Sequence, residues 1–407
     1  VQTWSFPSSI GVGNVGDTDG DGVPDLPVSP WFGVGATYIY SGSTGLLLAY
    51  LPGVGLGSAF GAPIEGLGDL TGDGLADFAV GATTAGPFSN GMGNAYIYAG
   101  GTWSQIGQLS GPSGSFFGGD IARIGDVTGD GLTDFAVGAP GVNSWSGEAR
   151  VFSGADLSQV TIIPGSPATP VFGLPMDGPG DVDGDGVPDL GVGIGQGTPA
   201  RVRVYSGADW TLVHEWLEPS NEWLLFGNGV AGCGDVNDDG FPDVLVGSPG
   251  TVGLTNKVRM FSGAPEGVSV FGVACPVSGG ILPRIGATGA AHLGQTIKIN
   301  LSQVPPGKPT LLLLGFTNQA WWGIPLPLDL AFVGLPGCAL LVSPDVPLGF
   351  TTSAFGPGNG RVVAPLSIPS QAALAGATFY AQWYVVDPGP APIPGAMTRG
   401  LAVTLLP

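Results

Sequence analysis

Basic side chains are scarce in this sequence. Its 407 residues include 11 Lys and Arg against 31 Asp and Glu, which gives a formal net charge of −20. The chain therefore lacks the basic stripe that neutralises phosphates, and we expect no nucleic-acid partner. Histidine is equally rare, with only His214 and His292. No Gly-x-Ser-x-Gly motif places a serine nucleophile beside them, so we predict that the protein is not an enzyme.

Long apolar runs and cysteines are also few. No apolar run reaches the roughly 18–20 residues of a membrane helix, so we expect no membrane span. The sequence starts at Val1 without a basic-then-apolar leader, and we interpret it as a mature chain that is secreted or displayed at the cell surface. Of three cysteines, we predict a disulfide between Cys275 and Cys338 and a buried thiol at Cys233. The alternative is three separate buried thiols.

Glycine and proline are abundant, with 75 and 38 residues. Such a share without apolar content would indicate disorder, but 43% of the residues are apolar. The glycines lie at regular intervals between short apolar runs. This pattern is typical of a large all-β protein with many tight turns.

An acidic loop of nine residues, Asp-x-(Asp/Thr/Asn)-x-Asp-Gly-x-x-Asp, occurs five times. The copies begin at Asp17, Asp69, Asp126, Asp181 and Asp235, at spacings of 52, 57, 55 and 54 residues. A period near 55 residues predicts a repeat architecture. The copies are called loops one to five below.

The loop pattern suits calcium. Oxygens at positions 1, 3, 5 and 9, with the backbone carbonyl at position 7, can surround Ca²⁺ at about 2.3–2.6 Å. We predict about five bound Ca²⁺, and the ligands are Asp17, Asp19, Asp21, Val23 and Asp25; Asp69, Thr71, Asp73, Leu75 and Asp77; Asp126, Thr128, Asp130, Leu132 and Asp134; Asp181, Asp183, Asp185, Val187 and Asp189; Asp235, Asn237, Asp239, Phe241 and Asp243. The alternative is an acidic turn without metal.

Position 3 distinguishes the loops. It is Asp19 and Asp183 in loops one and four, but Thr71, Thr128 and Asn237 in the others. The additional carboxylate predicts tighter binding at loops one and four. Five equivalent sites do not suit a single catalytic centre, so we expect the metal to be structural.

Other motifs recur around each loop. A Phe-Gly pair precedes loops two to five by nine residues, a strand ending in Val-Gly follows them, and an aromatic-Ser-Gly or similar triplet closes each repeat (Phe117-Gly118, Val137-Gly138 and Phe152-Ser153-Gly154 in the third). Residues 1–268 thereby resemble the FG-GAP repeats of the β-propeller in integrin α subunits. The resemblance implies four antiparallel strands per blade, with calcium between the first two strands. It also implies cell-surface recognition of a protein or glycan.

The first repeat departs from the pattern, because it has Phe6-Pro7 in place of a Phe-Gly pair. Five loops predict about five blades. A ring of blades must close, since an open edge strand invites aggregation. We expect Val1 to Pro7 to supply a strand to the last blade.

Residues 269–407 show no repeat and form the second predicted domain. Their β-rich runs, separated by Pro and Gly, predict a β-sandwich. These runs are Ile297–Leu301, Thr310–Phe316, Leu328–Phe332, Ala339–Val342, Arg361–Ile368, Thr378–Val385 and Gly400–Leu406. Only 8 of the last 138 residues are charged, which leaves apolar surface for a partner.

Trp210, Trp216 and Trp223 gather in the fourth repeat and are candidates for contact with a sugar or protein ligand. The alternative is an outer strand with packed aromatics. Two functions remain open. The first is a secreted, calcium-rigidified adhesion or recognition protein. The second is a structural subunit of an extracellular fibre or surface layer, which assembles with itself through propeller–sandwich contacts.

Overall fold

The structure is a computed structural model of the 407 residues. It describes residues 10–30, 35–55, 58–84, 91–196, 199–218, 226–249, 256–355, 359–387 and 395–407. The expected closing strand at Val1 to Pro7 and the candidate ligand residue Trp223 lie outside these ranges.

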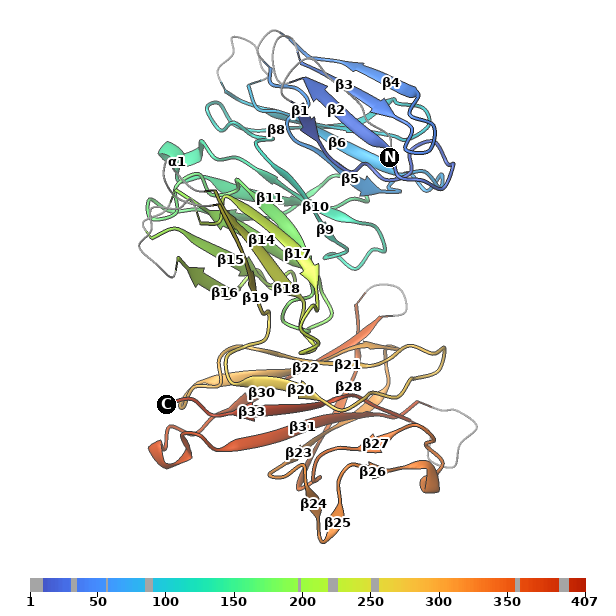
Figure 1. The fold of residues 1–407 in the computed structure, drawn as a ribbon, viewed down its shortest axis with the longest axis vertical. Helices are drawn as coiled ribbons and strands as arrows, with labels where there is room; N and C mark the ends of the chain where they lie inside the picture. Colours follow the sequence, from blue (N-terminus) through green and yellow to red (C-terminus); the bar gives the residue numbers. More distant parts are fainter. Residues whose placement is uncertain are drawn as a thin grey trace. The chain divides into compact units, whose positions relative to one another are not determined.

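The five repeats form five successive antiparallel sheets (Figure 1, blue to yellow). Within a sheet the strands follow chain order, so each strand pairs with its neighbour in sequence. Their bounds are β1 Ile10–Val12, β2 Leu26–Pro30, β3 Ala36–Tyr40 and β4 Leu47–Pro52; β5 Ile64–Gly68, β6 Asp77–Ala82, β7 Asn94–Tyr98 and β8 Gln105–Ser110; β9 Ile121–Gly125, β10 Asp134–Gly138, β11 Glu148–Phe152 and β12 Gln159–Pro164; β13 Met176–Gly180, β14 Asp189–Ile194, β15 Arg201–Tyr205 and β16 Leu212–Leu217; β17 Gly229–Gly234, β18 Asp243–Ser248 and β19 Lys257–Phe261.

The fifth sheet has three strands among the described residues, where the resemblance implied four. The segment that follows its last strand is β20 (Val268–Phe271), and it pairs with β33 (Gly400–Thr404) near the end of the chain. Val268 faces Val403 and Val270 faces Leu401 in this register. Because the C-terminal sheet offers β20 an apolar partner strand, the segment leaves the repeat pattern at this point.

The Phe-Gly motif anchors the inner part of each repeat. Phe60, Phe117, Phe172 and Phe226 are fully buried or nearly so. The glycine that follows each of these phenylalanines contacts the glycine of a Val-Gly pair on a neighbouring strand, through a hydrogen bond or by close backbone approach. Gly118 N donates to Gly138 O at 3.0 Å, and a Cβ on Gly138 would lie 1.9 Å from Gly173 O. A side chain there would clash with backbone, so both motifs require glycine.

The C-terminal residues form two further main sheets. One has the order β20-β33-β31-β23-β28, with β32 beside β31, and the other has the order β21-β22-β30-β29. Both contribute to one apolar core around Trp383, Ile297 and Leu401. The bounds are β21 Arg284–Thr288, β22 Thr296–Val304, β23 Pro309–Gly315, β28 Val346–Thr351, β29 Ser353–Ala354, β30 Gly360–Ser367, β31 Thr378–Val385 and β32 Ala396–Met397.

Short elements complete this part of the chain. They are the hairpins β24 (Ala320–Trp321) with β25 (Ile324–Pro325) and β26 (Leu328–Asp329) with β27 (Ala339–Leu340), and the 3-10 turns η1 (Ala331–Val333) and η2 (Ala372–Leu374). The predicted strand Leu328–Phe332 is wrong beyond Asp329, since the chain turns into η1. One four-residue helical turn, α1 (Val142–Trp145), lies in the third repeat.

The chain divides into two compact units by contact density. The first comprises Val1–Pro179, Leu190–Gly232 and Leu245–Met260, and the second comprises Gly180–Asp189, Cys233–Val244 and Phe261–Pro407. Loops four and five therefore pack with C-terminal residues, although they belong to repeats by sequence. The predicted domain boundary between residues 268 and 269 stays a prediction. Within the described residues, no helix combines the length and apolar character needed to cross a membrane.

Candidate cation sites in the acidic loops

Backbone N–H groups of each loop point toward the carboxylate of its first aspartate. In loop three, Asp126 Oδ1 accepts from Gly129 N at 2.6 Å and Oδ2 accepts from Gly131 N at 2.9 Å. Asp17, Asp69 and Asp235 make the same kind of contacts within their loops. Gly131 has φ +93°, a left-handed conformation, so position 6 requires glycine.

The last aspartate connects the loop to two strands. Asp134 is fully buried at the start of β10, and its Oδ2 accepts from Val127 N and Thr128 N, both at 2.8 Å. Its Oδ1 accepts from Gly154 N at 2.9 Å, just after β11. The predicted ligand at position 9 therefore also fixes the backbone, a second role that the sequence pattern alone did not indicate.

The aromatic-Ser-Gly motif supports the same arrangement from the third strand of the repeat. Ser153 Oγ donates to Asp130 Oδ2 at 3.2 Å, which holds the position-5 carboxylate. A Cβ on Gly154 would lie 2.1 Å from Thr133 O, so only glycine lets β11 approach the loop. The triplet is thus part of the loop's support.

Two loops bring three carboxylates together closely enough for one ion. In the described residues, such groups are Asp17, Asp19 and Asp21 in loop one and Asp181, Asp183 and Asp189 in loop four, with ligand oxygens within 4.8 Å of one another. These are the loops with an aspartate at position 3. Loops two, three and five place Thr71, Thr128 and Asn237 at that position.

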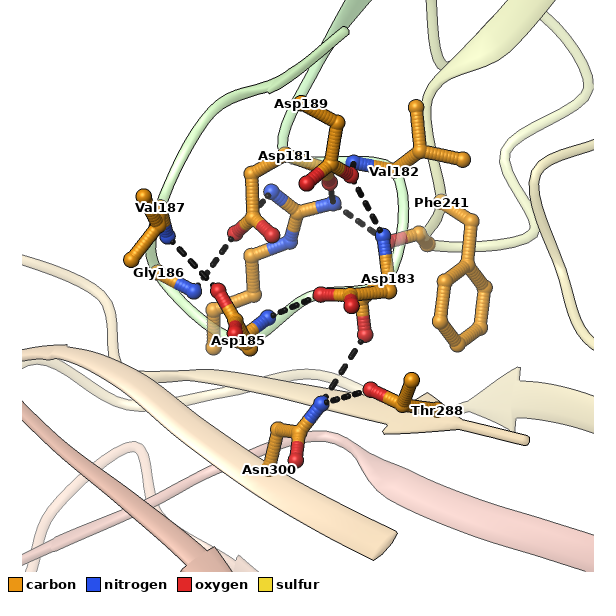
Figure 2. A network of polar contacts seen from close by, with 12 residues as sticks. Asp181, Val182, Asp183, Asp185, Gly186, Val187, Asp189, Phe241, Thr288 and Asn300 are labelled. Carbon is orange, nitrogen blue, oxygen red and sulfur yellow. Dashed lines mark hydrogen bonds and ion pairs between the residues drawn. The ribbon is translucent and has the colours of Figure 1, made fainter. Parts of the chain in front are cut away.

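Loop four differs from the other loops in its surroundings (Figure 2). Asp183 and Asp185 are almost completely buried, whereas Asp21 in loop one is exposed. Arg284 Nη1 lies 3.3 Å from Asp181 Oδ2, and Arg361 Nη1 lies 3.5 Å from Asp185 Oδ2. Burial raises the pKa of the Asp183 carboxyl well above its usual range, and the charges of Asp185 and Asp181 add to the effect.

The hydrogen bonds of the Asp181 carboxylate indicate whether loop four suits a cation. Its Oδ2 accepts from Gly186 N at 3.0 Å, but its Oδ1 is buried and has no hydrogen-bond partner. The matching oxygen in loop three accepts from Gly129 N. A buried carboxylate oxygen without a donor costs free energy, and a cation at this position would offset that cost. The donor set of loop four therefore fits a hard divalent cation.

A second group of acidic residues lies away from the loops. Glu65, Asp120 and Asp177 line a cavity of about 690 Å³ within the first compact unit. Each follows the phenylalanine of a Phe-Gly pair by three to five residues, a signal that the sequence analysis missed. Burial raises the pKa of Glu65 to about 8 and that of Asp120 to about 7, and nearby carboxylates add to both shifts.

Replacing Glu65 by glutamine is expected to increase stability at alkaline pH. The unfolded chain loses the Glu65 proton near pH 4.5, whereas the folded chain retains it to about 8. Between these values the folded state binds more protons, so the free energy of unfolding falls as pH rises. A glutamine side chain cannot ionise, so the variant lacks this fall.

The measurement is the melting temperature from about pH 5 to about pH 9. The Glu65→Gln variant should gain on the wild type as pH rises, while Glu266→Gln, an exposed position, should follow the wild type. A constant difference between Glu65→Gln and wild type over this window would contradict the prediction.

The other predicted site residues are only partly brought together. Trp216 stacks on His214 with ring centroids 5.0 Å apart on β16, and both are half-buried. Trp210 lies in the turn before β16 with φ +61°. Cys275 and Cys338 form a disulfide with Cα atoms 5.0 Å apart. Cys233 is a free, half-buried thiol that donates to Asp243 O.

Consecutive antiparallel sheets, each containing one acidic loop between its first two strands, form the architecture of an all-β propeller. Residues 118–163 and 226–258 match the FG-GAP repeat. The chain is 31% identical over 167 residues to integrin alpha-5 of Xenopus laevis, and 38% identical over 165 residues to integrin alpha-7 of Rattus norvegicus. Each match covers 38% of this chain but only 16% and 14% of those relatives.

Two solved structures resemble the chain loosely. One is described as BBS1N in complex with ARL6DN, with a TM-score of 0.37, 15% identity, and coverage of 60% of this chain and 65% of that chain. The other is described as the Dos1 propeller, with a TM-score of 0.39, 12% identity, and coverage of 59% and 55%.

Proposed function

We propose that this protein is an extracellular, non-enzymatic recognition or adhesion propeller whose loops bind Ca²⁺. The observation that carries the proposal is the buried, unpartnered Asp181 Oδ1 within a group of three carboxylates. The integrin relatives support the recognition role, although the matched part spans less than a fifth of their length. In this proposal the C-terminal strands form a β-sandwich module that follows the propeller in the chain, and the partner is a protein or glycan.

Calcium would act on stability in this proposal. Each loop would hold the ion with the oxygens at positions 1, 3, 5 and 9 and the carbonyl at position 7, as the sequence predicts. A ligand that binds only the folded state stabilises that state by mass action. The loops connect the first two strands of each sheet, so the ion would rigidify every blade.

The test is a calcium titration of the chelator-treated chain by calorimetry, with melting curves in millimolar Ca²⁺ and in excess EGTA. We expect binding of about five ions and a large drop in melting temperature in EGTA, since ligand at 100 times its dissociation constant contributes about 2.7 kcal/mol per site. A chain that binds no calcium and melts identically in both buffers would contradict the proposal. Protein and glycan arrays in Ca²⁺ then search for the partner.

A structural subunit of an extracellular assembly is the second candidate. Large apolar side chains are exposed in the C-terminal part, namely Trp322 (91% exposed), Phe316 (74%) and Phe332 (73%). In this candidate these side chains would contact a second copy of the chain. Light scattering and negative-stain imaging separate the two candidates, because filaments favour the subunit and a monomer favours the recognition protein. If filaments form, Trp322→Ala should reduce their assembly.

A further inference from the structure

Loop one and loop four provide a natural comparison within one chain. Their sequences, residues 17–25 and 181–189, differ only at position 2, which is Thr18 in loop one and Val182 in loop four. Loop one is largely exposed, whereas loop four lies against β21 and β22 within the second compact unit. The Thr18 hydroxyl donates to Asp25 within loop one, a local contact that Val182 cannot make in loop four. The larger difference lies in the surroundings, since loop one contacts residues of the first two repeats and loop four contacts C-terminal strands.

The C-terminal strands hold the backbone of loop four. Asn300 Nδ2, on β22, donates to Asp183 O at 3.1 Å and to Thr288 Oγ1 at 2.7 Å (Figure 2). Arg284 Nη2, on β21, donates to Asp181 O at 3.3 Å and to Gly240 O of loop five at 3.1 Å. These contacts fix the carbonyl groups between the carboxylates, and so they fix the direction in which the ligand oxygens point.

Backbone approaches backbone at the same contact. A Cβ built on Gly286, in β21, would lie 2.5 Å from Gly184 Cα and 2.8 Å from Asp183 O. The strand therefore packs directly on position 4 of the loop, and only glycine at both positions allows this distance. Loop four cannot be pressed against β21 in this way if either residue carries a side chain.

Carboxylates outnumber guanidinium groups at this contact. Loop four brings four carboxylates, and Arg284 and Arg361 bring two guanidinium groups. A divalent cation would add positive charge to this acidic group. Buried polar atoms without a partner gather here, namely Asp181 Oδ1, Asn300 Oδ1 and Ser302 Oγ. Burying charge without compensation is costly, so the docked strands need the cation more than an undocked loop would.

We propose that β21, β22 and β30 complete the fourth cation site, so that binding of a divalent cation to loop four and docking of these strands on the loop stabilise each other. The inference rests on the proposed calcium binding and adds a reciprocal coupling to it. Arg284 and Asn300 are positioning residues in this scheme. Loop one has aspartates at the same positions, and in this scheme it has no such coupling.

The test is amide hydrogen exchange of the full chain in millimolar Ca²⁺ and in excess EGTA, combined with calcium titration. In the wild type, Ca²⁺ should slow exchange in β21 and β22. Asp183→Asn should remove one bound ion and abolish this slowing. The matched variant Asp19→Asn, at the same position of loop one, should also remove one ion but leave the slowing intact.

Gly286→Ala tests the coupling from the other side. The added Cβ should separate β21 from loop four. The calcium affinity of one site should then fall by about fivefold or more, which is the lower end of the range for coupled sites. Arg284→Gln, a milder change, should let calcium bind while exchange in β21 no longer responds to it. If Gly286→Ala does not fold, Arg284→Gln carries the test.

The outcomes separate this inference from the proposed function. A wild type that binds no calcium would overturn both. A wild type that binds calcium, but in which exchange of β21 and β22 is unchanged or responds equally in Asp183→Asn and Asp19→Asn, would overturn the coupling alone. Calcium-dependent slowing that only the loop-four variant loses would support it.

Discussion

Replacing Trp383 by alanine is expected to lower the free energy of unfolding of the C-terminal part by about 3–5 kcal/mol, as for other fully buried aromatics. Trp383 is 0% exposed on β31. Its ring meets Phe350 edge-on at 5.4 Å, and its Nε1 donates to Asn300 O at 3.0 Å. The variant would leave a large cavity between the strands and a buried carbonyl without its donor.

Urea denaturation followed by far-UV circular dichroism measures this effect. Trp322→Ala is the control, because Trp322 is 91% exposed and a surface change of this kind stays within about 0.5 kcal/mol of wild type. Unfolding midpoints that coincide for Trp383→Ala and Trp322→Ala would show that Trp383 does not support the C-terminal core. Since β22 carries Asn300, a loosened core should also disturb loop four.

Replacing Asp134 by alanine is expected to cost about 3 kcal/mol or more, even in EGTA. Three backbone N–H groups, those of Val127, Thr128 and Gly154, would lose their acceptor. Each buried donor left without a partner costs about 1–3 kcal/mol. The loss arises from the backbone and not from the metal, so removal of calcium should not hide it.

Asp130→Ala is the matched control in the same loop, because Asp130 is exposed and water can satisfy the groups that its carboxylate leaves. In EGTA it should unfold close to the wild type, within about 1 kcal/mol, as expected for exposed polar contacts. In Ca²⁺ both variants should lose stability, since both residues are proposed ligands. If Asp134→Ala were as stable as wild type in EGTA, position 9 would serve only the ion.

The repeats were predictable because their determinants are local or periodic. The loops lie between the first two strands of each sheet, and the Phe-Gly phenylalanines are buried, as the motifs indicate. In the C-terminal part, the runs Thr378–Val385 and Arg361–Ile368 correspond to β31 and β30. The missed strands β21 and β28 contain Gly or Pro, which weakens the alternating apolar pattern that marks a strand.

The fourth strand of the fifth repeat shows why some elements could not be predicted. Val268–Phe271 has a strand-like sequence at the right place for that role, but it pairs with Gly400–Thr404, more than a hundred residues away. Propensity identifies a segment that will form a strand. The competition between possible partner strands decides which sheet the segment joins. The outcome of this competition depends on the whole folded chain.

Loops one and four illustrate the division most directly. The sequence by itself determined their conformation, because hydrogen bonds within nine residues and glycines at left-handed positions require only neighbours along the chain. Their environments were decided by the tertiary structure. Arg284, Asn300 and Arg361 lie more than ninety residues beyond loop four. The two loops have nearly identical sequences, so no pattern within them indicates which loop these side chains will bury. Burial and charge compensation are properties of the folded surroundings, so they distinguish sites whose local sequences differ at a single position.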